Sequence, residues 1–529
     1  MKNSFFLVIP AQQNISERLR IFEEKALKHW LDELPVANPG LSTRLIYDFL
    51  KEFNSLAMSA QTRLDALEIL SFRVSSVEEY LRFRLMQEGF PKEPDEHKIF
   101  NVLIAIEKEF TLGYWIVVKE LTRRSVGWFQ GKSAPLSIQR AIRGLSNIVV
   151  SHYLMNFPVP DWVWIDIHSL YRLSVKIKKD STNVPKSHLE PGQGLSVGDC
   201  YRQILLLCLA EPSGLMQKEV LQVFNFIEQH SAHLAISHSP FETQPHQCII
   251  LTDEDQGPHF ISESAPPSDS SVLYLGFNKL IKVLQNKSKF VSKEQARFSS
   301  LMLVKDGDGL LPAELLDYLL SRWTGIEFHG VPVFGDRLER YFCIGLEACH
   351  DLLSGDDPAN KLGEDEMVAE SASERSLACR FNKAGMISIG SLVGFRKKNS
   401  PISKRSLGVV NKITSVKADG KIGFEIQLLA SRVFAVSYKS YTKNETDELP
   451  QKALIYGVKN QESEKSFIIL ESFNLKDGDL IRMTMNNETF PIILRDRKNI
   501  GLGYWQFECR RVEELNVQKT ETKKGYDFI

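Results

Sequence analysis

The stretch that decides the fold of the C-terminal third is residues 386–437, which read MISIGSLVGFRKKNSPISKRSLGVVNKITSVKADGKIGFEIQLLASRVFAVS. Apolar and polar residues alternate there in short runs, and turn residues separate the runs. Such runs predict β-strands, most clearly at Leu407–Ile413 and Ile422–Leu428. Asp419-Gly420 lies between these two runs and favours a tight hairpin, because that turn requires a positive φ. Several short strands this close together indicate a small antiparallel barrel or sandwich.

A cluster of cations interrupts the predicted strands. Guanidinium groups hold phosphate oxygens in a bidentate manner and also stack on a guanine face, so Arg375, Arg380 and Arg396 to Lys398 could hold phosphates. The same cations could instead be solvated loop charges beside an acidic segment, and the altered spacing favours that alternative, although both interpretations stay open. The cluster consists of Arg396, Lys397, Lys398, Lys404 and Arg405.

Three phrases of the stretch, SLVGF (391–395), SLGVVNKI (406–413) and GKIGFEIQLLA (420–430), carry a family resemblance. Together they resemble the barrel core of a divergent PilZ-type domain. The whole chain resembles a group of large bacterial proteins with a helical front half and such a barrel behind it. The resemblance implies a receptor for the second messenger cyclic di-GMP, since PilZ domains are known for that role.

The PilZ pattern is Arg-x-x-x-Arg before the barrel, followed by Asp/Asn-x-Ser-x-x-Gly. The chain departs from it, because four residues separate Arg375 from Arg380, and Asn382 and Gly385 stand three apart instead of five. The resemblance, together with the cation cluster, implies a site for cyclic di-GMP without catalytic residues, metal or cofactor. Its predicted residues are Arg375, Arg380, Asn382, Gly385, Arg396 and Lys398.

The pattern along the chain predicts an α+β multidomain protein. It consists of an N-terminal all-α helical bundle or array, a mixed α/β middle region and a C-terminal tandem of small antiparallel β-barrels. The acidic, polar segment Ser354–Ser373 is the expected linker before the first barrel. The predicted domains are 1–180 (helical), 195–353 (mixed middle domain), 374–440 (PilZ-like barrel) and 449–515 (second small β domain).

Composition narrows the class of protein. The 529 residues carry 65 cationic and 66 anionic side chains, so no global attraction to a nucleic acid polymer or a membrane surface is expected. The seven cysteines are scattered without a C-x-x-C pair, which favours buried thiols in a reducing compartment over disulfides or zinc. No run reaches about 18 apolar residues and no signal peptide begins the chain, so we expect a cytoplasmic protein without membrane insertion.

These observations favour a non-enzymatic signalling or regulatory protein, a cyclic di-GMP receptor with an unidentified protein partner on its helical half. One alternative is an interaction scaffold or chaperone-like protein whose barrel has lost ligand binding. The other is a hydrolase or transferase with its site in the middle domain. Residues 194–198 (GLSVG) match a nucleophile elbow, but the preceding residues read as loop and Ser196 fits a helix cap better. His230, His233 and His238 lack a third ligand at a predictable position, so no metal site is expected.

Overall fold

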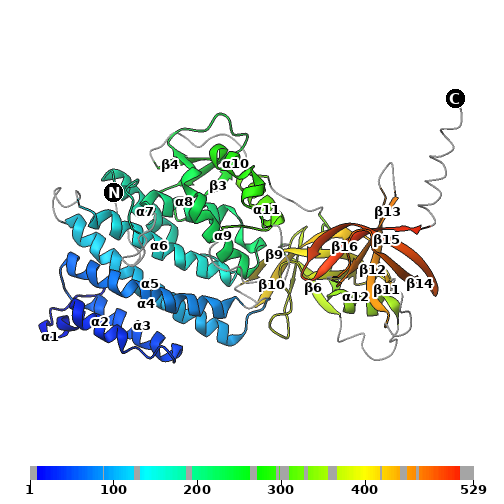
Figure 1. The fold of residues 1–529 in the computed structure, drawn as a ribbon, viewed down its shortest axis with the longest axis horizontal. Helices are drawn as coiled ribbons and strands as arrows, with labels where there is room; N and C mark the ends of the chain where they lie inside the picture. The colour runs from blue at the N-terminus through cyan, green and yellow to red at the C-terminus, as the bar shows by residue number, and fades with distance from the viewer. Residues whose placement is uncertain are drawn as a thin grey trace. The chain divides into compact units, whose positions relative to one another are not determined.

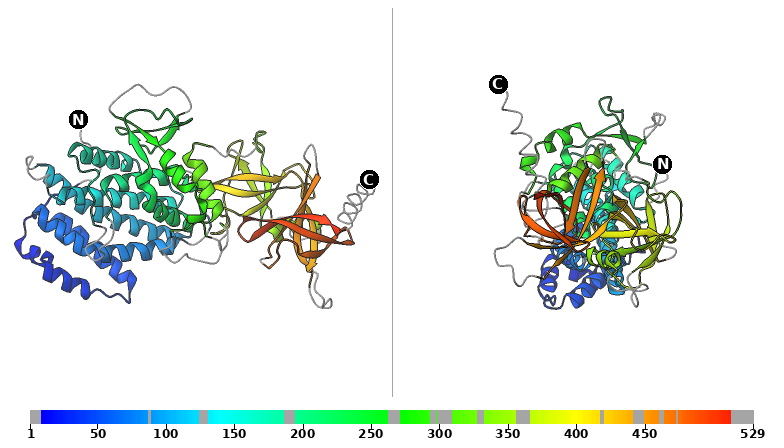
Figure 2. Two further views of the ribbon diagram at one scale, coloured as in Figure 1. Left: turned by 45° about the horizontal axis from the view of Figure 1, so that its top comes forward. Right: turned by 90° about the vertical axis from the view of Figure 1, so that its right-hand side faces the viewer.

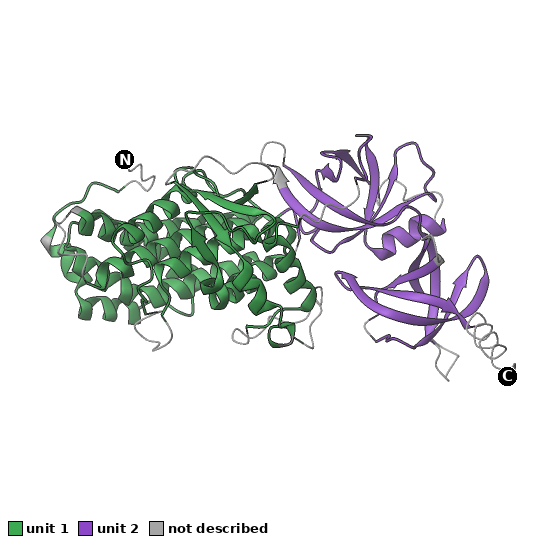
Figure 3. Cartoon of the chain, turned by 90° about the horizontal axis from the view of Figure 1, so that it is seen from above, with its two compact units in different colours: residues 1–88, 92–293, 305–327 green, residues 89–91, 294–304, 328–529 purple. Residues whose placement is uncertain are grey.

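The computed structural model describes residues 9–86, 89–123, 131–185, 194–261, 271–292, 297, 309–326, 332–355, 366–416, 420–440, 449–459, 464–472 and 474–512. The chain divides into two compact units (Figure 3). Unit 1 comprises residues 1–88, 92–293 and 305–327, and unit 2 comprises residues 89–91, 294–304 and 328–529.

Unit 1 is mainly helical. Some of its helices begin where the sequence supplies a cap: the Asn38 side chain accepts a hydrogen bond from the Leu41 amide, and Ser59 does the same for Thr62. The α-helices are α1 (Ser16–Leu19), α2 (Glu24–Asp32), α3 (Pro39–Ser55), α4 (Ala60–Leu85), α5 (Pro94–Arg123), α6 (Ser133–Leu154), α7 (Val163–Lys176), α8 (Val197–Leu209), α9 (Gln217–His230), α10 (Asn278–Leu284) and α11 (Ala313–Trp323).

Helices α4, α5 and α6 run alongside one another in the centre of unit 1 (Figures 1 and 2). Glycine allows the backbones to approach closely. A methyl group on Gly144 of α6 would lie 2.1 Å from the Thr111 hydroxyl oxygen of α5. One on Gly113 of α5 would lie 2.7 Å from a methyl carbon of Leu67 in α4. The packing of these three helices therefore depends on small residues at the crossing points.

A small antiparallel sheet belongs to the same unit. Its order is β1-β4-β2-β3, with β1 at Ala235–Ser237, β2 at Gln247–Leu251, β3 at His259–Ile261 and β4 at Val272–Gly276. Buried residues of the sheet, such as Ile250 and Leu275, join the same apolar core as Leu50 of α3. The predicted division between 1–180 and 195–353 is therefore no boundary between compact units, because one continuous core spans both ranges.

Unit 2 holds two closed six-stranded barrels, both antiparallel. The first has the ring order β10-β7-β6-β5-β8-β9 and the second β11-β12-β13-β16-β15-β14. The strands are β5 (Arg340–Ile344), β6 (Met367–Ser371), β7 (Ser376–Cys379), β8 (Leu392–Lys397), β9 (Ser406–Val416), β10 (Lys421–Ala430), β11 (Phe434–Ser440), β12 (Gln451–Lys459), β13 (Glu464–Leu470), β14 (Leu480–Met485), β15 (Glu488–Gly501) and β16 (Tyr504–Arg511).

The predicted fold class is confirmed, but the barrel boundaries differ from the prediction. The first barrel takes β5 from the predicted middle domain and β6 from the predicted linker, because β5 pairs with both β6 and β8 and so closes the sheet. The predicted barrel 374–440 also ended too late, since β11 pairs with β12 and β14 of the second barrel. Closure depends on strand pairs far apart in sequence, which alternation within one run does not reveal.

Helix α12 (Leu346–Ser354) follows β5 and joins the two barrels of unit 2. One apolar cluster contains Leu346 of α12, Leu392 and Leu407 of the first barrel, and Leu454 and Ile469 of the second. Lys452 of β12 also forms ion pairs with Glu347 and Asp351 of α12. The barrels are therefore held together by a shared core with an ionic rim.

No helix in the described part of the chain combines the length and the apolar character needed to span a membrane.

Two buried glutamates share one arginine inside unit 1. Arg82 of α4 lies 2.5 Å from a carboxylate oxygen of Glu107 in α5 and 3.4 Å from one of Glu78. Ser151 of α6 also donates a hydrogen bond to Glu107. Burial raises the pKa of Glu107 to about 7, although Arg82 counteracts this. In the folded protein Glu107 therefore keeps its proton up to about pH 7, whereas in the unfolded chain it releases the proton near pH 4.5.

We expect Glu107→Gln to flatten the pH dependence of stability. A raised folded pKa means that wild-type stability falls as pH rises from about 4.5 to about 7, by roughly 3 kcal/mol at most. The glutamine side chain in Glu107→Gln does not titrate, so this loss of stability with rising pH should disappear. The measurement is urea denaturation between pH 5 and 8, followed by tryptophan fluorescence, since six of the seven tryptophans belong to unit 1.

Glu79→Gln is the matched control, because Glu79 lies exposed on the same helix as Glu78. It should keep the wild-type pH profile. A Glu107→Gln variant with that same profile would contradict the assignment of the titrating group.

Candidate functional site

The predicted ligand residues lie around β7 and β8 of the first barrel. Arg375 precedes β7 and Arg380 follows it, while Leu377 between them is fully buried. Five residues of extended chain span about 16 Å, so the two arginines lie at opposite ends of the strand. β7 and β8 stand three places apart in the ring of six strands, on opposite sides of the barrel.

Strand register divides the six predicted residues into two groups. Arg340 at the start of β5 aligns with Lys397 at the end of β8 and with Ala369 in the middle of β6, so β6 and β8 both end at the barrel end where β5 starts. Since β6 is followed directly by β7, Arg375 lies at the same barrel end as Arg396 and Lys398. The other group, at the opposite end of the barrel, contains Arg380, Asn382 and Gly385. The structure therefore does not bring the six residues together in one cluster.

Arg396 is bound to a carboxylate of its own barrel. It donates two hydrogen bonds to Glu366, at 2.9 and 2.7 Å, and one to the Ser400 carbonyl at 2.7 Å. Its guanidinium carbon lies 4.5 Å from the centre of the Tyr341 ring. These contacts use the guanidinium fork and one of its faces, so Arg396 has a structural role in this arrangement.

Glu366 also accepts a hydrogen bond from Arg405, whose side chain is fully buried. Burial alone would raise the pKa of Glu366, but the hydrogen bonds from Arg396 and Arg405 outweigh it and lower the pKa. Glu366 is therefore ionised at neutral pH and neutralises two guanidinium groups only in part.

The neighbouring lysines are paired as well. Lys398 lies 2.8 Å from Glu339, and Lys397 lies 2.8 Å from Asp336. The Lys398 side chain is 55% exposed, so this ion pair contributes little to stability. A ligand phosphate at Lys398 would have to compete with the carboxylate that already binds it.

Arg375 differs from the cations on β8. Within the described part of the chain its guanidinium makes no hydrogen bond or ion pair, and its Nε is buried without a partner. Its backbone is held, since the Arg375 carbonyl accepts from the Ile426 amide and its amide donates to the Ser373 hydroxyl. The backbone of Arg375 is thus held in place, while its guanidinium binds no other group of the described residues.

The loop after β7 is anchored by a buried ring. Phe381 packs near Phe342 and Phe424 in the barrel interior, while Arg380, Asn382 and Lys383 are exposed around it. This alternation presents three polar side chains within four residues. The loop can offer both a guanidinium for phosphate and amide groups for a base edge.

A short strap from the connection between α4 and α5 supports this loop, and sequence reasoning missed it. Phe90 and Ile387 exchange both backbone hydrogen bonds, at 2.7 and 3.0 Å, and the Gly385 amide donates to the Pro91 carbonyl at 3.0 Å. Gly89 has φ +99°, and a methyl group there would lie 2.7 Å from the Gly385 backbone. Gly89 is therefore needed for the close approach of the two backbones. Gly385 has a positive φ of +69°, whereas the sequence had suggested it only as a ligand residue.

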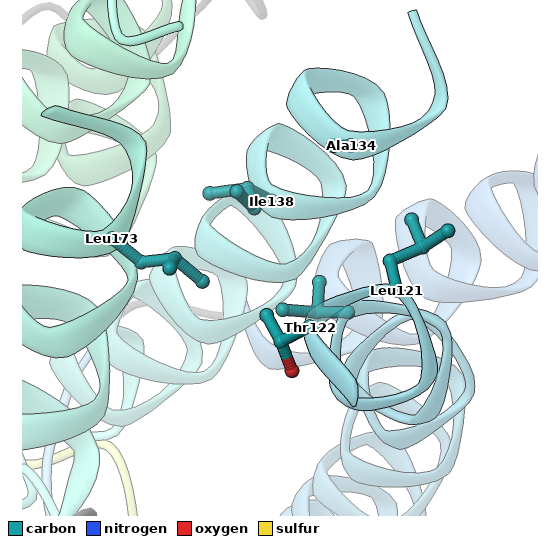
Figure 4. A pocket seen from close by; sticks show the side chains of 6 residues that line it. Leu121, Thr122, Ala134, Ile138 and Leu173 are labelled. Atoms are coloured by element: carbon teal, nitrogen blue, oxygen red, sulfur yellow. The ribbon is translucent and has the colours of Figure 1, made fainter. Parts of the chain in front are cut away.

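A shallow apolar depression lies between α5, α6 and α7 (Figure 4). It encloses no space for even a water molecule, whereas ligand pockets begin at roughly 300 Å³. Thr122 supplies a hydroxyl, but that group already donates to the Lys119 carbonyl. The depression has no group that could hold a phosphate. Its lining residues are Val118, Leu121, Thr122, Ala134, Ile138 and Leu173.

Ser196, the candidate nucleophile, caps α8. Its hydroxyl accepts from the Asp199 amide at 3.1 Å and donates to the Asp199 carboxylate at 2.7 Å, and the Asp199 carboxylate accepts from the Ser196 amide. This is the capping box that the sequence favoured. Across the described ranges, no three histidine, cysteine or acidic side chains gather in a way that could hold a metal ion.

The chain is similar to a known receptor. Residues 25–241, which run from α2 to just beyond β1, match the family model described as cyclic-di-GMP receptor FimW, N-terminal domain. Cyclic-di-GMP receptor FimW of Pseudomonas aeruginosa is 27% identical over 355 residues. The match covers 67% of this chain and 56% of FimW, so the chain spans little more than half the length of that relative. No solved structure matches.

We expect Glu366→Ala to destabilise the first barrel by about 3–5 kcal/mol, because it leaves two largely buried guanidinium groups without their carboxylate. The measurement is hydrogen exchange in peptides of β8 and β9. Lys398→Ala is the control, since it removes only a surface ion pair and should change stability by less than about 1 kcal/mol. Equal protection in the two variants would show that the buried cluster does not stabilise the barrel.

A second prediction concerns the strap. Gly89→Ala should loosen the loop at Gly385 and speed hydrogen exchange at Ile387, because the methyl group meets backbone that cannot move aside. Gly478→Ala is the matched control: its φ is +93°, but a methyl group there meets nothing within 4 Å. Both variants carry backbone strain of about 1–3 kcal/mol. Only Gly89→Ala should lower the stability by more than that strain. An equal loss of stability in the two variants would argue against the contact between Gly89 and Gly385.

Proposed function

We propose that this chain is a cyclic di-GMP receptor that acts as a non-enzymatic signalling protein in the cytoplasm. The similarity to cyclic-di-GMP receptor FimW is the observation that carries the proposal. The tandem of closed barrels in unit 2 supports it, because the PilZ resemblance predicted such a barrel. Ser196, the one nucleophile that a motif suggested, is used as a helix cap, which favours a binding role over a hydrolase.

We place the ligand at the loop after β7. Arg380 would hold a phosphate in a bidentate manner, Asn382 would read a guanine edge, and Lys383 adds positive charge beside them. The strap at Gly89–Pro91 fixes the loop backbone, so its side chains lose less freedom when they bind. Arg396 and Lys398 are left out of this site, because acidic residues already hold them.

A second candidate function is an interaction module that no longer binds the nucleotide. The ion pairs of Arg396 and Lys398 favour it, since they remove two of the six predicted contacts. In that case the helical unit would bind a protein partner and the barrels would serve as a second docking surface.

Isothermal titration calorimetry with cyclic di-GMP at physiological salt separates the two functions. We expect saturable binding that Arg380→Ala weakens at least tenfold, about 1.4 kcal/mol or more, as expected for a lost charged contact. Lys398→Ala, the control, should bind like wild type. Absence of binding to the wild-type chain would leave the interaction module as the function.

Arg375→Ala tests which end of the barrel is used. Arg375 lies at the other end of β7, so its loss should leave the affinity unchanged if the site is at Arg380. A loss of affinity in Arg375→Ala alone would place the site at the opposite end of the barrel, where β8 ends. A loss in both variants would mean that ligand binding rearranges the strand.

A further inference from the structure

Two cysteines lie side by side where α12 meets the first barrel. Cys343 is in β5 and Cys349 is in the second turn of α12, with Gly345 at the sharp bend between the elements. Both are fully buried. They belong to the apolar cluster that also contains Leu454 and Tyr456 of the second barrel, so they lie in the core that the two barrels share.

The two sulfur atoms face the same small space, which a glycine keeps open. A methyl group on Gly394 of β8 would lie 2.6 Å from the Cys349 sulfur and 3.2 Å from the Cys343 sulfur. The Cys343 sulfur also contacts the backbone of this glycine, since its thiol donates a hydrogen bond to the Gly394 carbonyl at 3.5 Å. The two sulfur atoms are therefore neighbours beside Gly394, and rotation of the two side chains would have to bring them to bonding distance.

A cation distinguishes this pair from the other cysteines. The Arg405 guanidinium lies 3.5 Å from the Cys343 sulfur. The hydrogen bond from Cys349 lowers the pKa of Cys343, burial opposes it, and Arg405 lowers it further. The pKa of Cys349 is raised well above its ordinary value. Burial raises the pKa of Cys200, Cys208 and Cys379 to about 11.

We propose that Cys343 and Cys349 form an oxidation site, a dithiol that hydrogen peroxide converts to a disulfide between β5 and α12. Cys343 is the nucleophile, because Arg405 stabilises its thiolate, and Cys349 is the resolving thiol. The bond would lock α12 onto the first barrel in the core between the barrels. Oxidation would therefore fix the arrangement of the two barrels within unit 2.

The chemistry balances with peroxide as the oxidant. The Cys343 thiolate attacks one peroxide oxygen, the O–O bond breaks, and the departing hydroxide takes the thiol proton to give water. The Cys349 sulfur then attacks the sulfenic acid sulfur, the S–O bond breaks, and that hydroxide leaves with the Cys349 proton as a second water. Two thiols lose two electrons and peroxide gains two.

The test is peroxide titration of the reduced full-length chain, followed by alkylation and mass spectrometry. Trypsin leaves both cysteines in one peptide, 341–361, so the disulfide removes two hydrogens from it and protects it from alkylation. Cleavage after Glu347 then separates the two cysteines and shows the link directly. We expect the free thiols to fall from seven to five before other cysteines react.

Variants assign the roles of the two thiols. Cys349→Ser should stop at a sulfenic acid on Cys343 that dimedone traps, and Cys343→Ser should give neither product. Cys379→Ser, a buried cysteine of the same barrel, should oxidise like wild type. The proposal is overturned if the wild-type chain, which needs no variant to fold, shows no 343–349 link when the partly exposed Cys208 is already modified.

Discussion

One buried carboxylate organises the first barrel. Glu366 lies between the guanidinium groups of Arg396 and Arg405, and all three side chains are at least nine-tenths buried. Two buried cations are costly unless they are paired, so the strands that bear them are held where the carboxylate can reach both. Arg405 also donates to the Gly394 carbonyl, which extends the network into β8. The face of the barrel that receives α12 is built on this cluster.

Ion pairing also distinguishes the cations of the barrel that are already bound to a carboxylate from those that are not. A guanidinium that already binds a carboxylate and lies on a tyrosine ring, as Arg396 does, would have to exchange strong contacts for a ligand. Arg375 has no such contacts in the described residues, and Arg380 stands on an exposed loop. Electrostatic pairing within the fold therefore commits Arg396 to the barrel itself, which the number of cations in the sequence does not show.

Polar groups in the interior also fix the helical unit, which contains the residues 25–241 that the FimW family model matches. Arg140 of α6 holds both carboxylate oxygens of Glu68 in α4, and the Tyr114 hydroxyl of α5 donates to the same group. Arg63 is fully buried and donates to the Phe53 and Leu56 carbonyls at the end of α3. Such contacts need one specific register of the helices, because an unpaired buried group would cost free energy.

The sequence alone determined the local structure. Alternation and turn residues located β9 and β10, whose antiparallel pairing follows the expected hairpin, and Ser196 with Asp199 predicted the cap of α8. These features depend on contacts only a few residues apart, which spacing can reveal. The tertiary structure alone decided that β5 closes the first barrel and that Arg396 and Lys398 are engaged. Their partners, Glu366 and Glu339, lie 30 and 59 residues away in the chain. Barrel closure and charge pairing join distant segments, so no local pattern encodes them.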